Sequence, residues 1–462
     1  MKKWSTTFAA IALVGLLTAA EPKSFEKKLS EGQKVQHALS RLTFGARPGD
    51  FEAVQKMGLD KWIDAQLHPE RIPENPELTQ RLAQLTTLNL SAREAADKYQ
   101  VPLKDLAQAL QGDDEAKAKA QAQLKGKQNG PQVPVRELTE AKLYRAIYSE
   151  HQLEEQLVDF WFNHFNVSVT KGADRLLTAS YERDAIRPNV LGKFRDLLGA
   201  TAAHPAMLFY LDNWQNSTPD GPGLFAKAKA KQARGINENY ARELMELHTL
   251  GVDNGYTQDD IIAVARCFTG WTILQPRLGG DFFFNPRMHD QNEKTVLGVK
   301  IPANGGLSDG NKVLDILARR PETAHFISLK LAQRFVADEP PSALVDRMAK
   351  KFRDTDGDIR AVVQAMIASP EFFSEAALNV KVKSPFEFVV SAVRATGEEP
   401  RNIARLNQKL VDLGQPLYRK VEPTGYSTMA ADWVNSSGLL ARMNFASEFK
   451  NKQVGSPEFQ RR

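Results

Sequence analysis

The chain contains one cysteine, Cys267, among its 462 residues. A single thiol cannot form an intramolecular disulfide, so cross-links within the chain do not stabilise the fold. Cys267 precedes Phe268 in a stretch with helical periodicity, and its basic neighbour Arg266 is adjacent in sequence and so points to another helix face. We interpret Cys267 as a core residue and not as a nucleophile, because a reactive thiolate needs a cationic, accessible setting.

Common catalytic and nucleotide-binding motifs are also missing. The sequence has no P-loop, no G-x-G-x-x-G, no G-x-S-x-G, no H-E-x-x-H and no internal repeat. These absences exclude the site types that such motifs build. The acidic run Asp354–Asp358 does not fit a calcium loop, because its glycine stands at the fourth position instead of the sixth. Asp358 is better explained as the cap of the helix that follows.

The chain carries only a small net charge. The net charge is +5, and the first twenty residues contribute Lys2, Lys3 and no acid, so 5 − 2 leaves +3 for the remainder. This charge is too small and too dispersed to indicate a nucleic-acid surface. The basic stretch AKAKAKQAR before Gly235 lacks aromatic residues that could stack on bases, and we interpret it as a solvated loop. We expect no nucleic-acid partner.

Residues 1–20 have the pattern of a secretory signal peptide. Lys2 and Lys3 are followed by the apolar run Phe8–Leu17, and Thr-Ala-Ala precedes Glu21. The apolar run is too short to span a bilayer, and small residues at its end suit cleavage. We therefore expect a periplasmic or secreted mature protein that is not attached to a membrane. An uncleaved membrane anchor is the alternative.

Helical periodicity dominates the rest of the sequence and predicts a mainly α fold, a multi-helix globular array with one short β-hairpin. We expect residues 21–450 to form a single large α-helical domain. A flexible polar insertion is expected at about 112–131, where Ala, Lys and Gln predominate without an apolar face. Residues 451–462 are expected to form a loose tail.

The expected hairpin pairs Phe282–Asn285 with Lys294–Ile301 and places His289 and Asp290 in its connecting loop. A polar His-Asp pair in such a loop has two interpretations. It can be exposed turn chemistry, or it can be a functional site, because loops carry function more often than cores do.

The most informative stretch is Gly235–Gly251, which predicts a helix with both ends marked. Asn237 can cap its start, and Gly251 suits a left-handed residue after its end. The predicted inward stripe consists of Tyr240, Ala241, Leu244, Leu247 and His248. The polar residues beside it are Glu238, Asn239, Arg242, Glu243 and Glu246. They can form a solvated face of i,i+4 ion pairs, each contributing about 0.2–0.5 kcal/mol. They can instead face a cleft, with carboxylates for acid–base chemistry or metal binding.

A second candidate lies in the run DFWFNHFNV at Asp159–Val167. Helical spacing places His164 on the aromatic side of this helix, with Asn163 beside it. A histidine among aromatic rings can be a core residue whose hydrogen bonds are satisfied. The alternative is a buried base or metal ligand.

Four long stretches resemble one bacterial family, known as domain of unknown function 1800. They are HALSRLTFGARPGD, DFWFNHFNV, GINENYARELMELHTLGVDNGYTQDDI, and ARCFTGW followed by HDQNEKTVLG. The resemblance extends from about Val35 to Phe445. It implies kinship with exported bacterial proteins and supplies no catalytic residues, because no activity is established for the family. It also implies a partner, since such proteins are encoded beside an exported family that resembles sulfatases.

Two functional hypotheses follow. The first is a hydrolase-like envelope enzyme, with Glu243 or Glu246 as base or metal ligand, Arg242 as anion clamp and His164 as acid–base partner. Its candidate residues are Glu238, Arg242, Glu243, Glu246, His164, Asn163, His289 and Asp290. The sequence identifies no metal or cofactor. The second hypothesis is a non-catalytic envelope binding or scaffold protein that acts with the sulfatase-like partner. Convergence of the candidates in one pocket favours the enzyme; charges paired only with each other favour the alternative.

Overall fold

The computed structural model describes residues 24–99, 130, 132–218, 235–276, 279–397, 399–400, 402–448 and 452–462. The expected signal peptide at residues 1–20 lies outside this part of the chain. Nearly all of the expected polar insertion at 112–131 also lies outside it. Among the described residues, no helix is both long enough and apolar enough to cross a bilayer.

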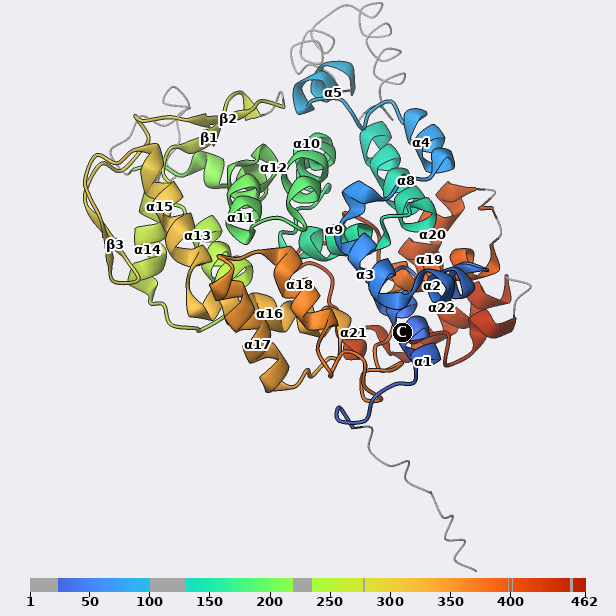
Figure 1. Ribbon diagram of the computed structural model, residues 1–462. Helices are drawn as coiled ribbons and strands as arrows, with labels where there is room; N and C mark the ends of the chain where they lie inside the picture. Colours follow the sequence, from blue (N-terminus) through green and yellow to red (C-terminus); the bar gives the residue numbers. More distant parts are fainter. Residues whose placement is uncertain are drawn as a thin grey trace, which may run out of the picture.

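The fold is mainly α, as the periodicity predicts (Figure 1). The first helices are α1 (Glu31–Leu42), α2 (Asp50–Met57), α3 (Leu59–Leu67), α4 (Pro76–Ala83), α5 (Ala92–Tyr99), α8 (Gln132–Tyr148), α9 (Gln152–His164), α10 (Asp174–Ser180), α11 (Phe194–Ala203), α12 (Pro205–Tyr210), α13 (Asn239–Glu243) and α14 (Gln258–Cys267). The later helices are α15 (Leu307–Ala318), α16 (Pro321–Phe335), α17 (Ser342–Asp354), α18 (Ile359–Ile367), α19 (Pro385–Thr396), α20 (Ile403–Asp412), α21 (Ala430–Trp433) and α22 (Ser436–Ser447). Two π-helices are η2 (Tyr181–Ile186) and η5 (Leu244–Thr249). Short 3₁₀ helices are η1 (Pro69–Arg71), η3 (Arg187–Asn189), η4 (Asn213–Gln215) and η7 (Lys452–Gly455).

Helix α9 lies at the centre of the molecule (Figure 1). Its side chains Leu153, Leu157 and Trp161 have no exposed surface, because the helix is surrounded by others. They belong to one hydrophobic cluster that extends from Ala38 in α1 to Val454 in η7. These apolar side chains recur at helical spacing and form the middle of the core.

A buried ionic network crosses the same core. Asp159 of α9 pairs with Lys142 of α8 at 2.8 Å and with Arg334 of α16 at 3.3 Å. Arg334 also pairs with Glu387 of α19 at 3.0 Å. Burial alone would raise the pKa of Glu387, but the charge of Arg334 and its neighbours outweighs burial and lowers that pKa to about 2. The network therefore links four helices through paired charges.

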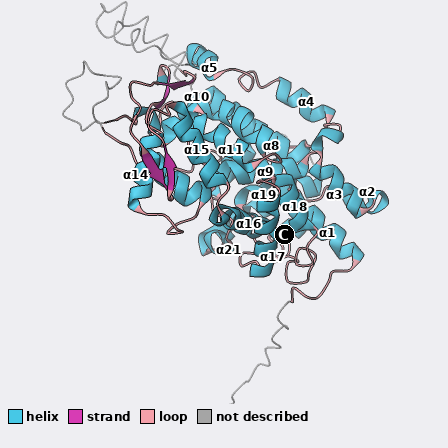
Figure 2. Ribbon diagram, turned by 60° about the vertical axis from the view of Figure 1, so that its left-hand side comes forward, coloured by secondary structure: helices cyan, strands magenta, loops and turns pink. Residues whose placement is uncertain are grey.

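The last residues of the chain are ordered, so the expectation of a loose tail is wrong for residues 452–462. Arg462 is only 2% exposed and pairs with Glu387 at 2.8 Å. Its backbone exchanges two hydrogen bonds with Lys381. The chain end therefore lies beside α1, near the ionic network (Figures 1 and 2). The polar composition of this segment gave no signal of this long-range pairing.

The strands form two separate two-stranded ribbons at one side of the molecule (Figure 2). Strand β1 (Trp271–Ile273) pairs antiparallel with β2 (Phe282–Phe284), and β3 (Lys294–Val296) pairs antiparallel with β4 (Val299–Ile301). The expected pairing of Phe282–Asn285 with Lys294–Ile301 is therefore wrong. Leu297 and Gly298 both have positive φ, at 49° and 78°, and close β3 and β4 into a tight local turn.

Candidate functional site

The stretch Gly235–Gly251 begins as α13 and continues as the π-helix η5. Asn237 accepts a hydrogen bond from the backbone N–H of Asn239 at 2.9 Å, and Gly251 has a φ of 96°. Gly251 thus marks the end of the helix as predicted, whereas the N-cap is Glu238 and Asn237 lies one residue before it. The π-helix was not predicted; π-helices are rare and occur often at functional sites.

The charges on this stretch pair with each other. Arg242 lies 3.4 Å from Glu238 and 3.3 Å from Glu246. Gln258 of α14 accepts from Arg242 at 3.0 Å and donates to Glu238 at 2.7 Å. The Arg242, Glu238 and Glu246 side chains are 40%, 38% and 22% exposed, so water screens these pairs. This geometry matches a partly solvated face of ion pairs.

Glu243 differs from the other carboxylates of this stretch. It is half-buried and has no hydrogen-bond or ion-pair partner in the part of the chain that the structure describes. Burial raises its pKa, and the nearby charge of Glu246 raises it further. Its charge also contributes to the raised pKa of Tyr210, after burial and other groups. Glu243 is the candidate carboxylate best suited to hold a proton.

The asparagines of the stretch have structural partners. The Oδ1 atom of Asn216 accepts the backbone N–H of Asn237 at 2.9 Å. The side chain of Asn237 donates to the carbonyl of Asp212 at 3.0 Å, and that of Asn239 donates to the carbonyl of Leu211 at 3.2 Å. We call this set of three asparagines the asparagine clasp. It joins residues 211–216 to residues 237–239.

His164 is buried in the core and Asn163 is partly buried, and both side chains have hydrogen-bond partners. His164 donates through Nε2 to the carbonyl of His248 at 3.0 Å and lies against the rings of Phe160 and Trp161. Burial lowers its pKa well below the ordinary value, so the ring is neutral at pH 7. Asn163 donates to a carbonyl within α9 and accepts the backbone N–H of Tyr426 at 3.0 Å. The structure brings neither side chain into contact with the carboxylates of the 235–251 stretch.

His289 is fully enclosed in a second polar cluster. It bonds the carbonyl of Thr269 through Nδ1 at 2.8 Å and Asp309 through Nε2 at 3.2 Å. Lys294 also pairs with Asp309, at 2.8 Å, and the three charged or ionisable side chains are 0% exposed. We call His289, Lys294 and Asp309 the buried triad. Sequence analysis missed Lys294 and Asp309, which carry no local signal of burial.

Asp290 points away from this triad towards Arg266, which it contacts at 2.7 Å. Burial alone would raise the pKa of Asp290, but hydrogen bonds from Arg266 and Asn292 outweigh it and lower that pKa. Cys267 is buried, as predicted, and burial raises the pKa of its thiol to about 12. Among the described residues, no group of three or more His, Cys, Asp or Glu side chains is placed to hold a metal ion.

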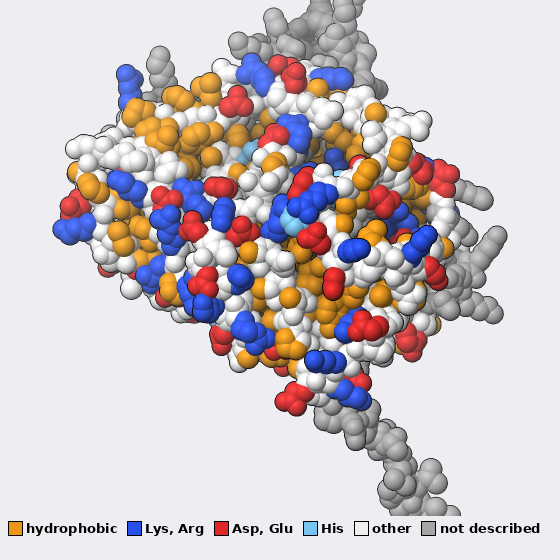
Figure 3. Space-filling view, in the orientation of Figure 1, with side chains coloured by type: hydrophobic (Ala, Val, Ile, Leu, Met, Phe, Trp, Pro, Cys, Tyr) orange, Lys and Arg blue, Asp and Glu red, His pale blue; other side chains and the backbone are white. Residues whose placement is uncertain are grey.

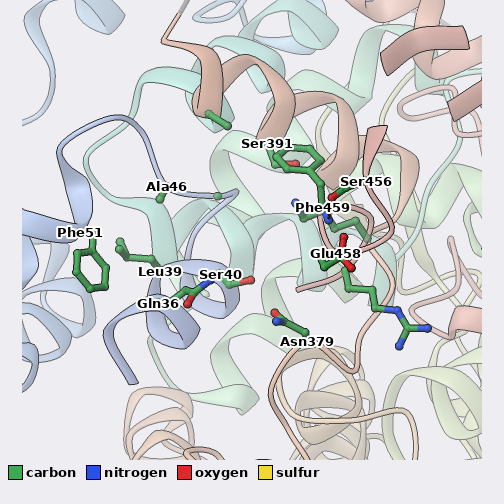
Figure 4. A pocket seen from close by; sticks show the side chains of 14 residues that line it. Gln36, Leu39, Ser40, Ala46, Phe51, Asn379, Ser391, Ser456, Glu458 and Phe459 are labelled. Carbon is green, nitrogen blue, oxygen red and sulfur yellow. Dashed lines mark hydrogen bonds between the residues drawn. The ribbon is translucent and has the colours of Figure 1, made fainter. Parts of the chain in front are cut away.

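A pocket of about 730 Å³ lies between α1, α2, α19 and the last residues of the chain, where sequence analysis expected no site (Figure 4). Figure 4 shows Leu39 and Phe51 on one side and Ser391, Ser456 and Phe459 on the other. Its lining consists of Gln36, Leu39, Ser40, Gly45, Ala46, Phe51, Asn379, Lys383, Ser391, Ala395, Ser456, Glu458, Phe459 and Arg461. This volume is in the range of small-molecule sites.

Lys383 is the unusual side chain of this pocket. Its Nζ atom lies 3.8 Å from the ring centre of Phe459, and it has no hydrogen-bond or ion-pair partner among the described side chains. Burial lowers its pKa to about 7, partly opposed by the charge of Glu387. At neutral pH the amine is therefore divided between its charged and neutral forms. The order of Lys-Ser-Pro at the start of α19 signals a helix cap and gives no sign of this amine.

Charges of both signs alternate over the face seen in Figure 3, where no large area of one sign is visible.

The sequence matches the model of one protein family, described as "Protein of unknown function (DUF1800)", over residues 37–460. No curated protein and no solved structure matches the chain.

Proposed function

Because the chain belongs to the DUF1800 family, whose description names no activity, we propose a function from its side chains: an exported envelope protein that binds an acidic saccharide in the Lys383 pocket. The observation that carries this proposal is the Lys383 amine. It is a buried amine, partly charged at neutral pH, without an acidic partner among the described residues, and it lines a pocket of ligand size.

The polarity of the pocket supports this ligand class. Serine hydroxyls and the amides of Gln36 and Asn379 can hydrogen-bond a polyhydroxylated ligand. The rings of Phe51 and Phe459 offer apolar faces to its C–H groups. Two cations, Lys383 and Arg461, face one acid among the lining residues, which favours a negatively charged ligand over a neutral one.

Calorimetry tests this proposal. Short oligomers of galacturonic acid are expected to bind, whereas neutral glucose oligomers of equal length are expected to bind at least tenfold more weakly. A carboxylate beside Lys383 favours the charged amine, so binding at pH 7 is expected to take up a proton, measurable in buffers with different ionisation heats. Lys383→Met removes the amine and keeps its stem; Lys350→Met, at a 69% exposed lysine, is the control. Equal affinity of both variants for the acidic oligomers would refute the proposal.

A hydrolase centred on Glu243 is the second candidate, favoured by the unpaired state and raised pKa of that carboxyl group. Chromogenic glycosides and esters provide the assay, with Glu243→Gln compared to Glu246→Gln. The enzyme hypothesis expects the larger loss of turnover in the first variant and a smaller one in Glu246→Gln, whose charge raises the pKa of Glu243; Glu339→Gln, at an exposed carboxylate, is the control that should keep full turnover. Absence of turnover by the unchanged protein across the panel would leave binding as the supported function.

Export and a sulfatase-like partner belong to the same proposal. The pattern of residues 1–20 supports export. Cell fractionation and N-terminal sequencing are expected to find the protein in the periplasm or medium and starting near Glu21. Pull-down with the tagged sulfatase-like neighbour is expected to retain it, and failure at micromolar concentrations of both proteins would remove this partner.

A further inference from the structure

A second hollow, of about 240 Å³, lies between α4, α8, the end of α10 and the η2–η3 segment. Helices α4 and α8 pack side by side here (Figure 1). Three of its charged side chains are arginines, Arg145, Arg183 and Arg187, and one is an acid, Glu182. We call this hollow the arginine pocket. It is separate from the Lys383 pocket, with which it shares no lining residue.

Two of the three arginines are held by other groups. Arg187 donates to both carboxylate oxygens of Glu155, at 2.6 and 3.0 Å. Arg183 donates to both oxygens of Asp184, at 2.7 and 2.6 Å, and also to the carbonyl of Leu88 at 2.7 Å. These contacts fix the two guanidinium groups and largely neutralise them.

Arg145 is different. Its guanidinium has no hydrogen-bond or ion-pair partner in the part of the chain that the structure describes. Burial lowers its pKa, and the charge of Arg187 lowers it further. Glu182 does not satisfy it, because the carboxylate accepts the Tyr418 hydroxyl at 2.6 Å and Arg187 at 3.4 Å. Among the described residues, a partly buried cation with five N–H donors is thus left without an acceptor.

We propose that the arginine pocket binds a tetrahedral oxyanion, phosphate or sulfate, carried by a small apolar group. A planar guanidinium fork matches the oxygens of such an anion. The apolar wall formed by Leu82, Leu88 and Leu138 suits the group that carries the anion. A volume of about 240 Å³ has room for that group as well as for the anion.

Calorimetry with phenyl phosphate and phenyl sulfate tests the proposal, with phenol as the uncharged comparison. Arg145→Met removes the fork and keeps an apolar stem. Arg136→Met is the matched control, because Arg136 lies on the same helix and is 60% exposed. The unchanged protein and Arg136→Met are expected to bind one or both esters equally well. Arg145→Met is expected to bind the same ester at least tenfold more weakly. Phenol is expected to show no measurable binding to any of the three proteins.

Stability in anion-free buffer separates this role from a structural one. If Arg145 awaits a ligand, Arg145→Met should unfold at the same urea concentration as the unchanged protein or higher, because it removes an unsatisfied buried cation. The proposal is overturned if neither ester binds, if Arg145→Met binds as tightly as Arg136→Met, or if Arg145→Met unfolds at clearly lower urea.

Discussion

The buried triad provides the sharpest test of the packing argument. Lys294→Met and Asp309→Asn each remove one charge from a contact of 2.8 Å while nearly preserving shape. With an effective dielectric constant of about 20, the attraction across this distance is about 6 kcal/mol, offset by several kcal/mol for desolvating each ion. Removing one partner leaves the other charge buried and uncompensated. Each single variant is therefore expected to lose about 3–5 kcal/mol of unfolding free energy.

The double variant Lys294→Met/Asp309→Asn is expected to be more stable than either single variant. Neither charge remains to be desolvated, and the Oδ1 atom of Asp309 already lacks a hydrogen-bond partner among the described residues. Urea unfolding followed by tryptophan fluorescence measures all three variants against the unchanged protein. Lys350→Met is the control, since its partner Asp354 is 53% exposed and water screens their contact, so no change in stability beyond the error of the assay is expected.

Additive losses would refute this reasoning. If the double variant loses the sum of the two single losses, the two charges do not compensate each other, and the triad is not a coupled structural unit. Such a result would return His289 to the set of candidate catalytic residues, because its partner Asp309 would then have a role independent of Lys294.

Two further predictions concern acid sensitivity and the asparagine clasp. Burial lowers the pKa of His248 from about 6.5 in the unfolded chain to about 3 in the folded protein. Between these two pH values the unfolded chain binds one proton at this histidine that the folded protein does not bind. The free energy of unfolding therefore falls as the pH decreases below 6.5. When the free energy of unfolding is measured with urea at pH 5 and pH 6, its increase with pH should be smaller in His248→Gln by about 1.4 kcal/mol per pH unit. An increase equal to that of the unchanged protein would contradict the assigned pKa. Asn216→Ala leaves the Asn237 N–H without its acceptor and should cost about 1–3 kcal/mol in the same assay, whereas a loss below about 0.5 kcal/mol would show that the clasp is dispensable.

Local features of the fold could be predicted from the sequence because neighbouring residues determine them. Asp358 caps α18 by accepting the backbone N–H of Ala361, and Gly251 adopts the left-handed conformation that its position suggests. The helical pattern of α9 identifies its apolar side, but Glu155 and Asp159 on its polar side are also buried, because other helices surround α9.

Features that depend on distant residues could not be predicted. The sequence gives Lys294 and Asp309 no sign that they meet in the core, and Arg462 contacts Glu387 across 75 positions (462 − 387). The inward stripe of the 235–251 stretch was partly wrong for a local reason. Met245 is fully buried, whereas Leu247, expected inward, is only partly buried, because the π-helix widens the turn and changes the phase of the pattern.

The π-helix η5 also affects how relatives of this chain should be aligned. Its backbone bonds span five residues, as in the hydrogen bond from the N–H of Leu250 to the carbonyl of Met245 at 2.8 Å. Loss of one residue between 244 and 249 would close an ordinary four-residue turn and leave the helical faces before and after it in register. In most helices the same deletion rotates everything downstream by about 100°. A one-residue gap at this place in an alignment therefore signifies a change of helix type and not a displaced core.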